Sequence, residues 1–421
     1  MSFVGRPLRA AVRVFIIGPV AELGGAERVL LDFISSVKAI DPDTSFHIVL
    51  FSDGPLSAAV KRLGGTVTIL PFPKQLHAIG EAASVNSGWS FASRALSAFL
   101  RSGRSLIAFL VALRSEIKRY APDLIHTNGI KAHIIACLVA PSHIPIVWHM
   151  HDFIGGRRLS RALLRHTSCR VTAVVAISKA VACDIRSNLP DVWVVTIPNA
   201  LDTEEFSPAE GEPERLDCLA GFHAVLPGTI RIGLVATYAR WKGQHVFLRA
   251  AARLNDLLPT RQFRYYIVGG PIYATRSSQF ASNELKASIV ELGLERCAGL
   301  VAFQGDVVPI LRSLDIVVHA STEPEPFGRT ILEAMACGRS IVASNGGGAA
   351  ELVEDGRTGL LHTSGDPIEL ADKLAILVRD PELRADLGRR ARCRAVSSYS
   401  RERLGPALLS LYRSILESDG I

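Results

Sequence analysis

The chain has 421 residues, 48% of them hydrophobic and 21% charged, which predicts two to three folded domains and excludes a disordered chain or a small disulfide-stapled scaffold. The formal net charge of +7 resides in the first half, because residues 1–203 carry 22 Lys and Arg against 13 Asp and Glu, while the remaining residues carry 25 against 27. No zinc-finger spacing and no RNA-platform motif occurs, so this excess does not indicate a nucleic-acid partner.

The first half alternates short β-branched runs with helical stretches, which is typical of a parallel sheet flanked by helices. Its strands are expected at 12–18, 47–52, 66–70, 124–127, 144–149 and 171–177. Residues 1–203 are therefore expected to form a first doubly wound domain. The next segment, 204–228, is rich in Pro, Glu and Gly and has no strong period, which predicts a linker.

The second half repeats this alternation, with strands expected at 231–236, 264–268, 301–304, 316–319 and 340–343. Residues 229–400 are expected to form a second Rossmann-like domain. The C-terminal segment, 401–421, contains a predicted helix over 401–417 that is long enough to pack back on the first domain. Ligands of open α/β sheets bind beyond the carboxyl ends of the strands, so motifs that follow strands are the candidate sites.

The first such motif contains two adjacent glycines, Gly24 and Gly25, before a helix expected over 26–37. It is neither a GxGxxG dinucleotide fingerprint nor a P-loop, because no GK[ST] follows. The backbone N–H groups at such a helix start can approach an anion. A plain strand-to-helix turn is the alternative interpretation.

The second domain offers a basic turn directly after its first strand, in the sequence RWKG. Two cations, Arg240 and Lys242, stand two residues apart at a helix start. This arrangement suits a diphosphate, with Lys242 as a point charge and Arg240 as a planar fork. A solvated basic turn is the alternative.

The strongest site signal is the run EPEPFGRTILEAMACG over 323–338. Its residues Glu325 and Glu333 are eight apart, so both can lie at one end or on one face of the helix that begins near Gly328. Glu333 stands in an apolar stripe, where a carboxylate needs hydrogen-bond partners such as sugar hydroxyls. The helix start would meet a phosphate with the residues Phe327, Gly328, Arg329 and Thr330.

This run strongly resembles the nucleotide-binding half of family 4 retaining glycosyltransferases, the glycosyltransferase group 1 type. The resemblance covers nearly the whole chain through an ordered series of motifs: GGAERVLL, PDLIHTNG, WHMHD, AISKA, IPNALD, RWKG and VGGP. It implies the GT-B architecture, with two facing Rossmann-like domains. It also implies that the acceptor binds to the first domain and the nucleotide sugar to the second.

The resemblance assigns roles to residues of the second domain. Glu325 matches the family glutamate that lies close to the transferred sugar, and Glu333 matches the one that binds the nucleotide ribose. Lys242 matches the diphosphate-binding lysine. The family's phosphate-binding arginine falls on Thr237 in this sequence, so Arg240 is the expected substitute.

In the first domain, the resemblance assigns a role to His151, which matches the histidine that reaches the donor sugar. Gly24 and Gly25 match the loop that contacts phosphate or acceptor. Two further histidines, His126 and His149, are read either as ligand contacts or as buried core residues. Three others, His47, His133 and His319, are expected to be structural.

The expected activity is retaining transfer of a hexose-type sugar from a nucleoside-diphosphate sugar to a glycan or lipid-linked acceptor. Lys242 and Arg240 would neutralise the leaving diphosphate, so neither a metal ion nor a further cofactor is expected. The alternatives are an inverting transferase or a sugar-nucleotide epimerase of the same architecture, and a non-catalytic nucleotide-sugar binding protein. A nicotinamide dehydrogenase is disfavoured because the GxGxxG fingerprint is missing.

The basic first half contains two stretches that suit helices lying on an anionic membrane. Residues 82–120 carry six Lys and Arg against Glu116 alone, and residues 157–170 carry five Arg and no acid. Solvated faces of ordinary packing helices are the alternative.

No apolar run is long enough for a spanning helix or a signal peptide, and the seven cysteines form no CxxC pair. The expected location is the cytoplasm, with peripheral attachment to the inner face of the membrane.

Overall fold

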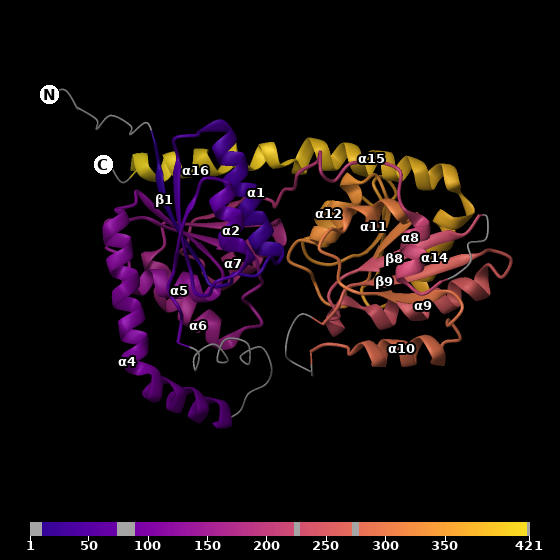
Figure 1. Ribbon diagram of the computed structural model, residues 1–421, viewed down its shortest axis with the longest axis horizontal. Coiled ribbons are helices and arrows are strands. Elements are labelled where there is room, and N and C mark those ends of the chain that lie inside the picture. The colour runs from indigo at the N-terminus through magenta and orange to yellow at the C-terminus, as the bar shows by residue number, and fades with distance from the viewer. Residues whose placement is uncertain (1–10, 74–88, 223–227, 272–277, 419–421) are drawn as a thin grey trace. The chain divides into compact units, whose positions relative to one another are not determined.

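The structure, a computed structural model, describes residues 11–73, 89–222, 228–271 and 278–418, with only the backbone of 89–102. It divides into two compact units (Figure 1), residues 1–200 with 401–421 and residues 201–400. Each unit contains one parallel sheet with helices packed on it. The predicted α/β class with two Rossmann-like units is therefore confirmed.

The first unit is built on a seven-stranded parallel sheet in the order β3-β2-β1-β4-β5-β6-β7. Its strands are β1 Arg13–Gly18, β2 Ser45–Leu50, β3 Thr66–Ile69, β4 Leu124–Asn128, β5 Ile146–Met150, β6 Ala173–Ala176 and β7 Val194–Thr196. Strands β4, β5 and β6 are buried along their whole length, as expected where helices cover both faces of a sheet. The strand order reverses between β1 and β4, and ligands bind at such a switch point in open α/β sheets.

Helices of the first unit include the C-terminal helix, which packs against α1 (Figure 1). They are α1 Gly25–Ile40, α2 Pro55–Arg62, α4 Trp89–Tyr120, α5 Ile130–Val139, α6 Arg158–Thr167, α7 Lys179–Asn188 and α16 Leu404–Ser418. The backbone N–H of Gly405 donates to Ser36 Oγ at 2.8 Å. A Cβ atom at Gly405 would lie only 2.7 Å from Ser36, so a glycine at this position permits the close approach of α16 to α1.

The second unit has a six-stranded parallel sheet in the order β10-β9-β8-β11-β12-β13. Its strands are β8 Ile230–Val235, β9 Phe263–Val268, β10 Ala298–Val301, β11 Ile316–His319, β12 Ser340–Ser344 and β13 Leu360–His362. Its helices are α8 Pro213–Leu219, α9 Gln244–Leu257, α10 Ser282–Glu291, α11 Val308–Ser313, α12 Arg329–Ala336, α13 Ala349–Leu352, α14 Pro367–Arg379 and α15 Pro381–Tyr399. One apolar cluster joins α9, α10 and α14 to the sheet.

Three elements differ from the sequence prediction. The strands β7 and β13 were not expected, because runs of three residues are too short to show a period. Strand β10 overlaps the expected strand 301–304 at Val301 only. It begins earlier because Gly299 can enter the sheet beside α8, where a Cβ atom would lie 2.7 Å from the carbonyl oxygen of Ala220.

The segment 204–228, expected as a linker, belongs by its contacts to the second unit and contains α8. The reason is a buried ion pair, in which Arg231 Nη2 lies 2.8 Å from Asp217 Oδ2. A buried charge needs such a partner, so α8 is held to β8. Among the helices that the structure describes, none combines the length and the apolar character needed to cross a membrane.

Candidate functional site

Two loops meet at the carboxyl edge of the second sheet, because β8 and β11 are neighbouring parallel strands. After β8 the chain forms a 3-10 turn, Arg240–Lys242, and after β11 it leads to α12. The backbone N–H of Thr322 donates to the carbonyl of Trp241 at 2.8 Å and joins the two loops. As a result, Lys242 Nζ lies 2.5 Å from Glu325 Oε1.

Glycines let the backbone approach this pair closely. Gly243 has a φ of +75°, and a Cβ atom there would lie 1.9 Å from the carbonyl oxygen of Ala320. Gly347 has a φ of +64°, and its Cβ atom would lie 2.3 Å from the carbonyl oxygen of Glu325. The N–H of Gly348 donates to that same carbonyl at 2.7 Å. Both sides of the Lys242–Glu325 pair therefore rest on backbone that larger residues would disrupt.

The carboxylate of Glu325 is largely buried and is bonded on both of its oxygens. Besides Lys242 on Oε1, Oε2 accepts from His319 Nε2 at 2.6 Å and from Ser321 Oγ at 3.0 Å. Burial by itself would raise the pKa of Glu325, but the charges and hydrogen bonds of Lys242 and His319 outweigh it and hold the pKa well below its ordinary value. Glu325 is therefore ionised at neutral pH.

Helix α12 begins after Gly328, whose φ is +98°, and it has no side-chain cap. The sequence predicted sugar hydroxyls as partners for Glu333, and the structure provides a protein partner as well. Arg329 Nε lies 2.9 Å from Glu333 Oε1, and Glu333 is 8% exposed. The i, i+4 spacing of the two residues was the signal that could have indicated this pair. Phe327 is buried and Thr330 is half-buried at the same helix start.

Arg240 lies on the same turn as Lys242, but its guanidinium is engaged with α10. Its Nη2 lies 2.7 Å from Glu284 Oε1, and the guanidinium carbon lies 4.4 Å from the centre of the Phe280 ring. Both charged side chains are more than 40% exposed, so water and salt screen their attraction. The sequence could not reveal this pair, because Glu284 is 44 residues away.

The two predicted glycines of the first unit, Gly24 and Gly25, lie at the start of α1. Glu27 folds back onto this helix start, and its carboxylate accepts from the backbone N–H groups of Gly24 and Glu27 itself. Burial outweighs these hydrogen bonds and raises the pKa of Glu27. An anionic ligand would therefore meet the carboxyl of Glu27 at the helix start.

Three histidines lie on or directly after neighbouring strands of the first unit: His126 on β4, His149 on β5 and His151 after β5. His126 Nδ1 lies 2.7 Å from the hydroxyl of Tyr412 on α16, and its Nε2 lies 3.2 Å from His149 Nδ1. The rings of His149 and His151 are 4.3 Å apart between centres. Burial lowers the pKa of His126 to about 3 and that of His151 to about 4, so both rings are neutral at pH 7.

Of these histidines, His151 comes directly after β5, at the carboxyl edge of the first sheet. Its Nε2 is buried and has no hydrogen-bond partner among the described residues, and the same holds for His149 Nε2. Buried polar atoms normally form hydrogen bonds, so each of these two nitrogens is a candidate to form one with a ligand. His133, expected to be structural, is buried and lies 2.6 Å from Thr127 Oγ1.

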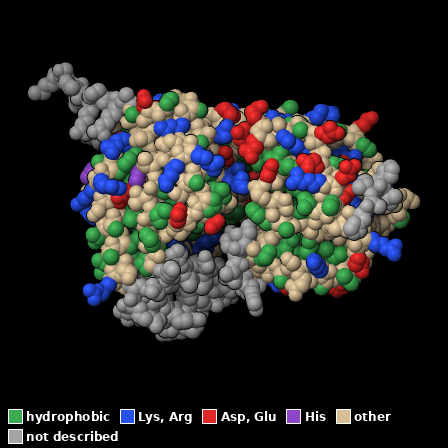
Figure 2. Space-filling view, in the orientation of Figure 1, with side chains coloured by type: hydrophobic (Ala, Val, Ile, Leu, Met, Phe, Trp, Pro, Cys, Tyr) green, Lys and Arg blue, Asp and Glu red, His purple; other side chains and the backbone are tan. Residues whose placement is uncertain are grey.

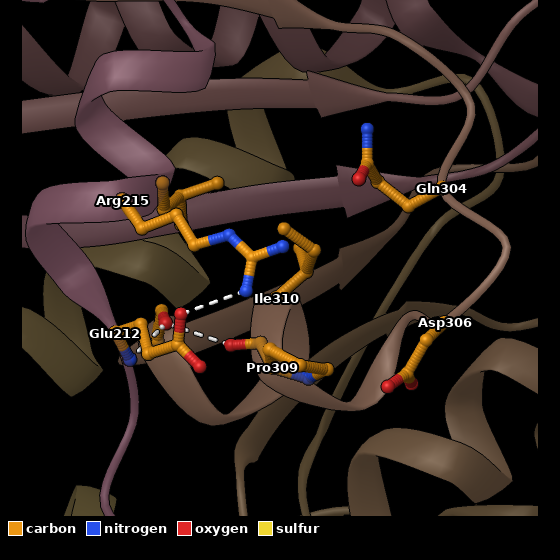
Figure 3. A pocket seen from close by; sticks show the side chains of 8 residues that line it. Glu212, Arg215, Gln304, Asp306, Pro309 and Ile310 are labelled. Atoms are coloured by element: carbon orange, nitrogen blue, oxygen red, sulfur yellow. Dashed lines mark hydrogen bonds and ion pairs between the residues drawn. The ribbon is translucent and has the colours of Figure 1, made fainter.

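The second unit also has a surface pocket (Figure 3). It is formed by α8, α11 and the segment after β10. Arg215 Nη1 lies 2.8 Å from Glu212 Oε2 in this pocket. None of the site residues predicted from the sequence lines it.

Two family models match the chain, "Glycosyltransferase Family 4" over residues 23–205 and "Glycosyl transferases group 1" over residues 225–394. Among similar proteins is D-inositol 3-phosphate glycosyltransferase of Corynebacterium jeikeium, 33% identical over 60% of this chain and 57% of that protein. Another is the lipopolysaccharide core biosynthesis mannosyltransferase LpcC of Rhizobium leguminosarum, 30% identical over 61% of this chain and 70% of that protein. The chain spans about half the length of the first curated relatives that it matches.

Solved structures with the same fold cover almost the whole chain. Anabaena Alr3699/HepE in complex with UDP-glucose has a TM-score of 0.76 and 24% identity, over 96% of this chain and 100% of that one. Sucrose-phosphate synthase from Thermosynechococcus elongatus has a TM-score of 0.73 and 17% identity, over 97% and 100%. At these identities the likeness establishes the fold.

Proposed function

The chain belongs to the family 4 glycosyltransferases of group 1, and on that premise we propose that it transfers a hexose-type sugar from a nucleoside-diphosphate sugar to an acceptor hydroxyl, with retention of anomeric configuration. The observation that carries the proposal is the buried pair of Lys242 and Glu325. A cation beside an anion suits a substrate whose diphosphate gains negative charge while its sugar ring gains positive charge in the transition state.

Lys242 would bind the diphosphate without leaving Glu325. Its ammonium group has three hydrogens, and Glu325 Oε1 accepts one of them. The others can be donated to phosphate oxygens. Because negative charge builds up on the leaving diphosphate, this interaction is stronger in the transition state than in the bound donor and therefore accelerates the reaction.

Glu325 would act by its charge rather than by proton transfer. Its low pKa keeps it ionised, so it is a poor general acid at neutral pH. An ionised carboxylate near the sugar stabilises an oxocarbenium-like ring. The proton of the acceptor hydroxyl would pass to the departing phosphate oxygen, and no side chain need form a covalent intermediate.

We further propose that the reaction needs no metal ion. Lys242, Arg240 and the backbone N–H groups at the start of α12 would together stabilise the leaving diphosphate. Arg240 would have to leave Glu284, and this change costs little because their pair is exposed. We also propose His151 as a contact for the donor sugar, because its Nε2 is buried and has no hydrogen-bond partner among the described residues.

The relatives suggest which donors to test first. One structural neighbour was solved with UDP and with UDP-glucose, and one sequence relative is named a mannosyltransferase. We therefore propose a nucleotide hexose as donor, and a glycan or lipid-linked acceptor with free hydroxyls. Figure 2 shows acidic side chains gathered mainly over the second unit, and residues 1–203 carry the positive excess of the chain. This excess suits an acceptor that carries anionic groups or lies beside them.

Helix α6 is the part of the first unit that would contact an anionic membrane. It exposes Leu159 and Leu163 together with Arg158 and Arg165. These residues combine an apolar stripe with positive charge, as an interfacial helix does. The other arginines of 157–170 have protein partners. Arg161 Nη1 donates to the carbonyl of Gly155 at 2.9 Å, Arg157 Nη2 lies 3.4 Å from Asp152 Oδ2, and Arg170 Nη2 donates to the carbonyl of Pro141 at 3.1 Å.

The basic stretch 82–120 includes α4 of the first unit, and some of its arginines have partners within the protein. Arg114 Nη1 donates to the carbonyl of Val139 at 2.6 Å, and Arg119 pairs with Glu116. The side chains of 89–102, which include the first arginines of this stretch, lie outside the described residues. Membrane attachment therefore rests on α6 in this proposal.

The test of this attachment is co-flotation of the protein with anionic vesicles. The Arg158→Glu/Arg165→Glu variant should no longer float with the vesicles, whereas Arg389→Glu, in the second unit, should still do so.

The transfer reaction is tested with a panel of nucleotide hexoses, first by thermal shift and then by turnover. We expect a cognate donor to raise the unfolding temperature, and the product to keep the anomeric configuration of the donor. Lys242→Ala and Glu325→Ala should each lower kcat about 10²-fold or more, as loss of one charge-stabilising group does. Arg215→Ala, in the pocket of Figure 3, is the matched control and should retain turnover. An inverted product, or full turnover by Lys242→Ala, would contradict the proposal.

A further inference from the structure

His319 was expected to be a structural histidine, yet it lies against the carboxylate of the candidate site. It is the last residue of β11 and is 8% exposed. Its Nε2 lies 2.6 Å from Glu325 Oε2. An ionised carboxylate only accepts hydrogen bonds, so the hydrogen of this contact resides on the histidine nitrogen.

The other ring nitrogen of His319 is bonded from the neighbouring strand. Its Nδ1 lies 3.0 Å from Ser344 Oγ, and Ser344 is the last residue of β12. The parallel register pairs His319 with Ala343, which brings Ser344 beside the ring. An imidazolium ring carries a hydrogen on Nε2 in any case, and in a neutral ring a hydrogen bond donated by Ser344 to Nδ1 selects the tautomer with its hydrogen on Nε2, so both forms can donate to Glu325.

The remaining groups around Glu325 leave its carboxylate little freedom. Ser321 Oγ lies 3.0 Å from Glu325 Oε2 and 3.1 Å from His319 Nε2. Two other titratable groups face this cluster: Lys242, bonded to Glu325 Oε1, and His362, whose Nε2 lies 3.3 Å from the carbonyl oxygen of His319. The backbone of Glu325 is also held, by its bridge to Gly347.

We propose that His319, supported by Ser344, is a positioning residue that fixes the orientation of the Glu325 carboxylate, so that Oε1 stays on Lys242 and the charge faces the sugar. This inference rests on the proposed function, because it concerns the same site. Without the imidazole, the carboxylate would lose a short hydrogen bond on Oε2 and could rotate away from the sugar. Its remaining partners on the described residues would be Ser321 and Lys242.

The first test of this role needs no turnover. In ¹³C-glutamate-labelled full-length protein, the carboxyl resonance of Glu325, assigned through Glu325→Gln, is titrated with pH. The wild-type signal should not titrate down to pH 4, because its pKa is held well below the ordinary value. In His319→Phe the midpoint should rise by at least about one pH unit, and His319→Gln, whose amide can donate, should fall between the two.

A second histidine close to a glutamate, in the first unit, provides the control. His47 Nε2 lies 2.9 Å from Glu116 Oε1 without the geometry of a hydrogen bond, and its Nδ1 lies 2.7 Å from Thr66 Oγ1. His47→Phe makes the same substitution at a buried histidine beside a glutamate and should leave the Glu325 signal unchanged. A Glu325 titration that is the same in His319→Phe and wild type would overturn the proposal.

Kinetics separate this inference from the proposed function. With an active donor, His319→Phe should lower kcat about 10- to 100-fold, as the loss of a supporting hydrogen bond does, while the affinity for UDP stays within about threefold. His319→Gln should recover most of that loss. If the wild type transfers no sugar but the Glu325 midpoint still moves, the proposed function fails and the positioning role stands. If turnover is present and His319→Phe retains it fully, the positioning role is wrong.

Discussion

Lys242→Met is the substitution that tests the central pair of the site most directly. It removes the ammonium that lies 2.5 Å from Glu325 Oε1 and keeps a side chain of similar length. The two side chains are 17% and 12% exposed, so the remaining carboxylate would be left in a poorly hydrated place. Removing one partner of a buried ion pair costs about 3–5 kcal/mol.

The cost at this site should be smaller than that full value, because Glu325 keeps two other partners. His319 and Ser321 still donate to Oε2 in the variant. With these hydrogen bonds intact, we expect Lys242→Met to destabilise the second unit by about 2–3 kcal/mol. Glu325→Gln leaves the ammonium of Lys242 without its carboxylate and should cost about 1–3 kcal/mol.

The assay is a double-mutant cycle followed by differential scanning calorimetry, with nucleotide used to identify the transition of the second unit. The double variant removes both charges together, so it should be less destabilised than the sum of the single variants, by about 1.5 kcal/mol or more. The refuting result is additivity within about 0.5 kcal/mol, which would mean that the two charges do not interact in solution.

The stability that Glu325 contributes should depend on pH in a direction set by its pKa. The folded-state pKa of Glu325 is depressed, so its contribution to stability is fully present above the ordinary carboxyl pKa and is lost progressively as the pH falls from there through the lower folded value. Lys242→Met raises the folded-state pKa toward that of the unfolded chain, so the variant has less of this contribution to lose as the pH falls. Calorimetry should therefore show the destabilisation by Lys242→Met in full at pH 7 and a smaller difference from the wild type once the pH falls below the ordinary carboxyl pKa.

Three further substitutions probe other parts of the molecule. Gly243→Ala places a Cβ atom 1.9 Å from a backbone carbonyl oxygen at a φ of +75°. The free energy of unfolding should therefore fall by about 2 kcal/mol or more, with a clear fall in the unfolding temperature, and an unchanged midpoint would contradict the backbone geometry. Tyr412→Phe removes the hydroxyl that meets His126 at 2.7 Å and should cost about 1–2 kcal/mol, measured by urea unfolding, whereas no loss would mean that water replaces the hydroxyl. Arg240→Ala should leave the midpoint of thermal unfolding unchanged, because its ion pair is exposed, but should weaken UDP binding in calorimetric titrations about threefold to tenfold; equal affinity would remove Arg240 from the diphosphate site.

The amino-acid sequence by itself determined the fold class and most of the candidate site. Alternating strands and helices are encoded by local periodicity, and a parallel sheet places the ends of its strands at one edge. For this reason the basic turn at Lys242 and the acidic run at Glu325 could be assigned to the same edge, and they lie in contact there. The C-terminal helix was likewise expected to return to the first unit, and it belongs there by its contacts.

Tertiary structure alone decided which side chains act together. His319 was expected to be structural because its sequence neighbourhood is an ordinary buried strand, and only the register with β12 and the course of the next loop bring it between Ser344 and Glu325. Arg240 was assigned to a diphosphate, but a glutamate 44 residues away holds it in the structure. Local patterns specify helices, strands and turns, whereas a hydrogen bond between distant residues depends on packing to within a few tenths of an ångström, which no sequence spacing encodes.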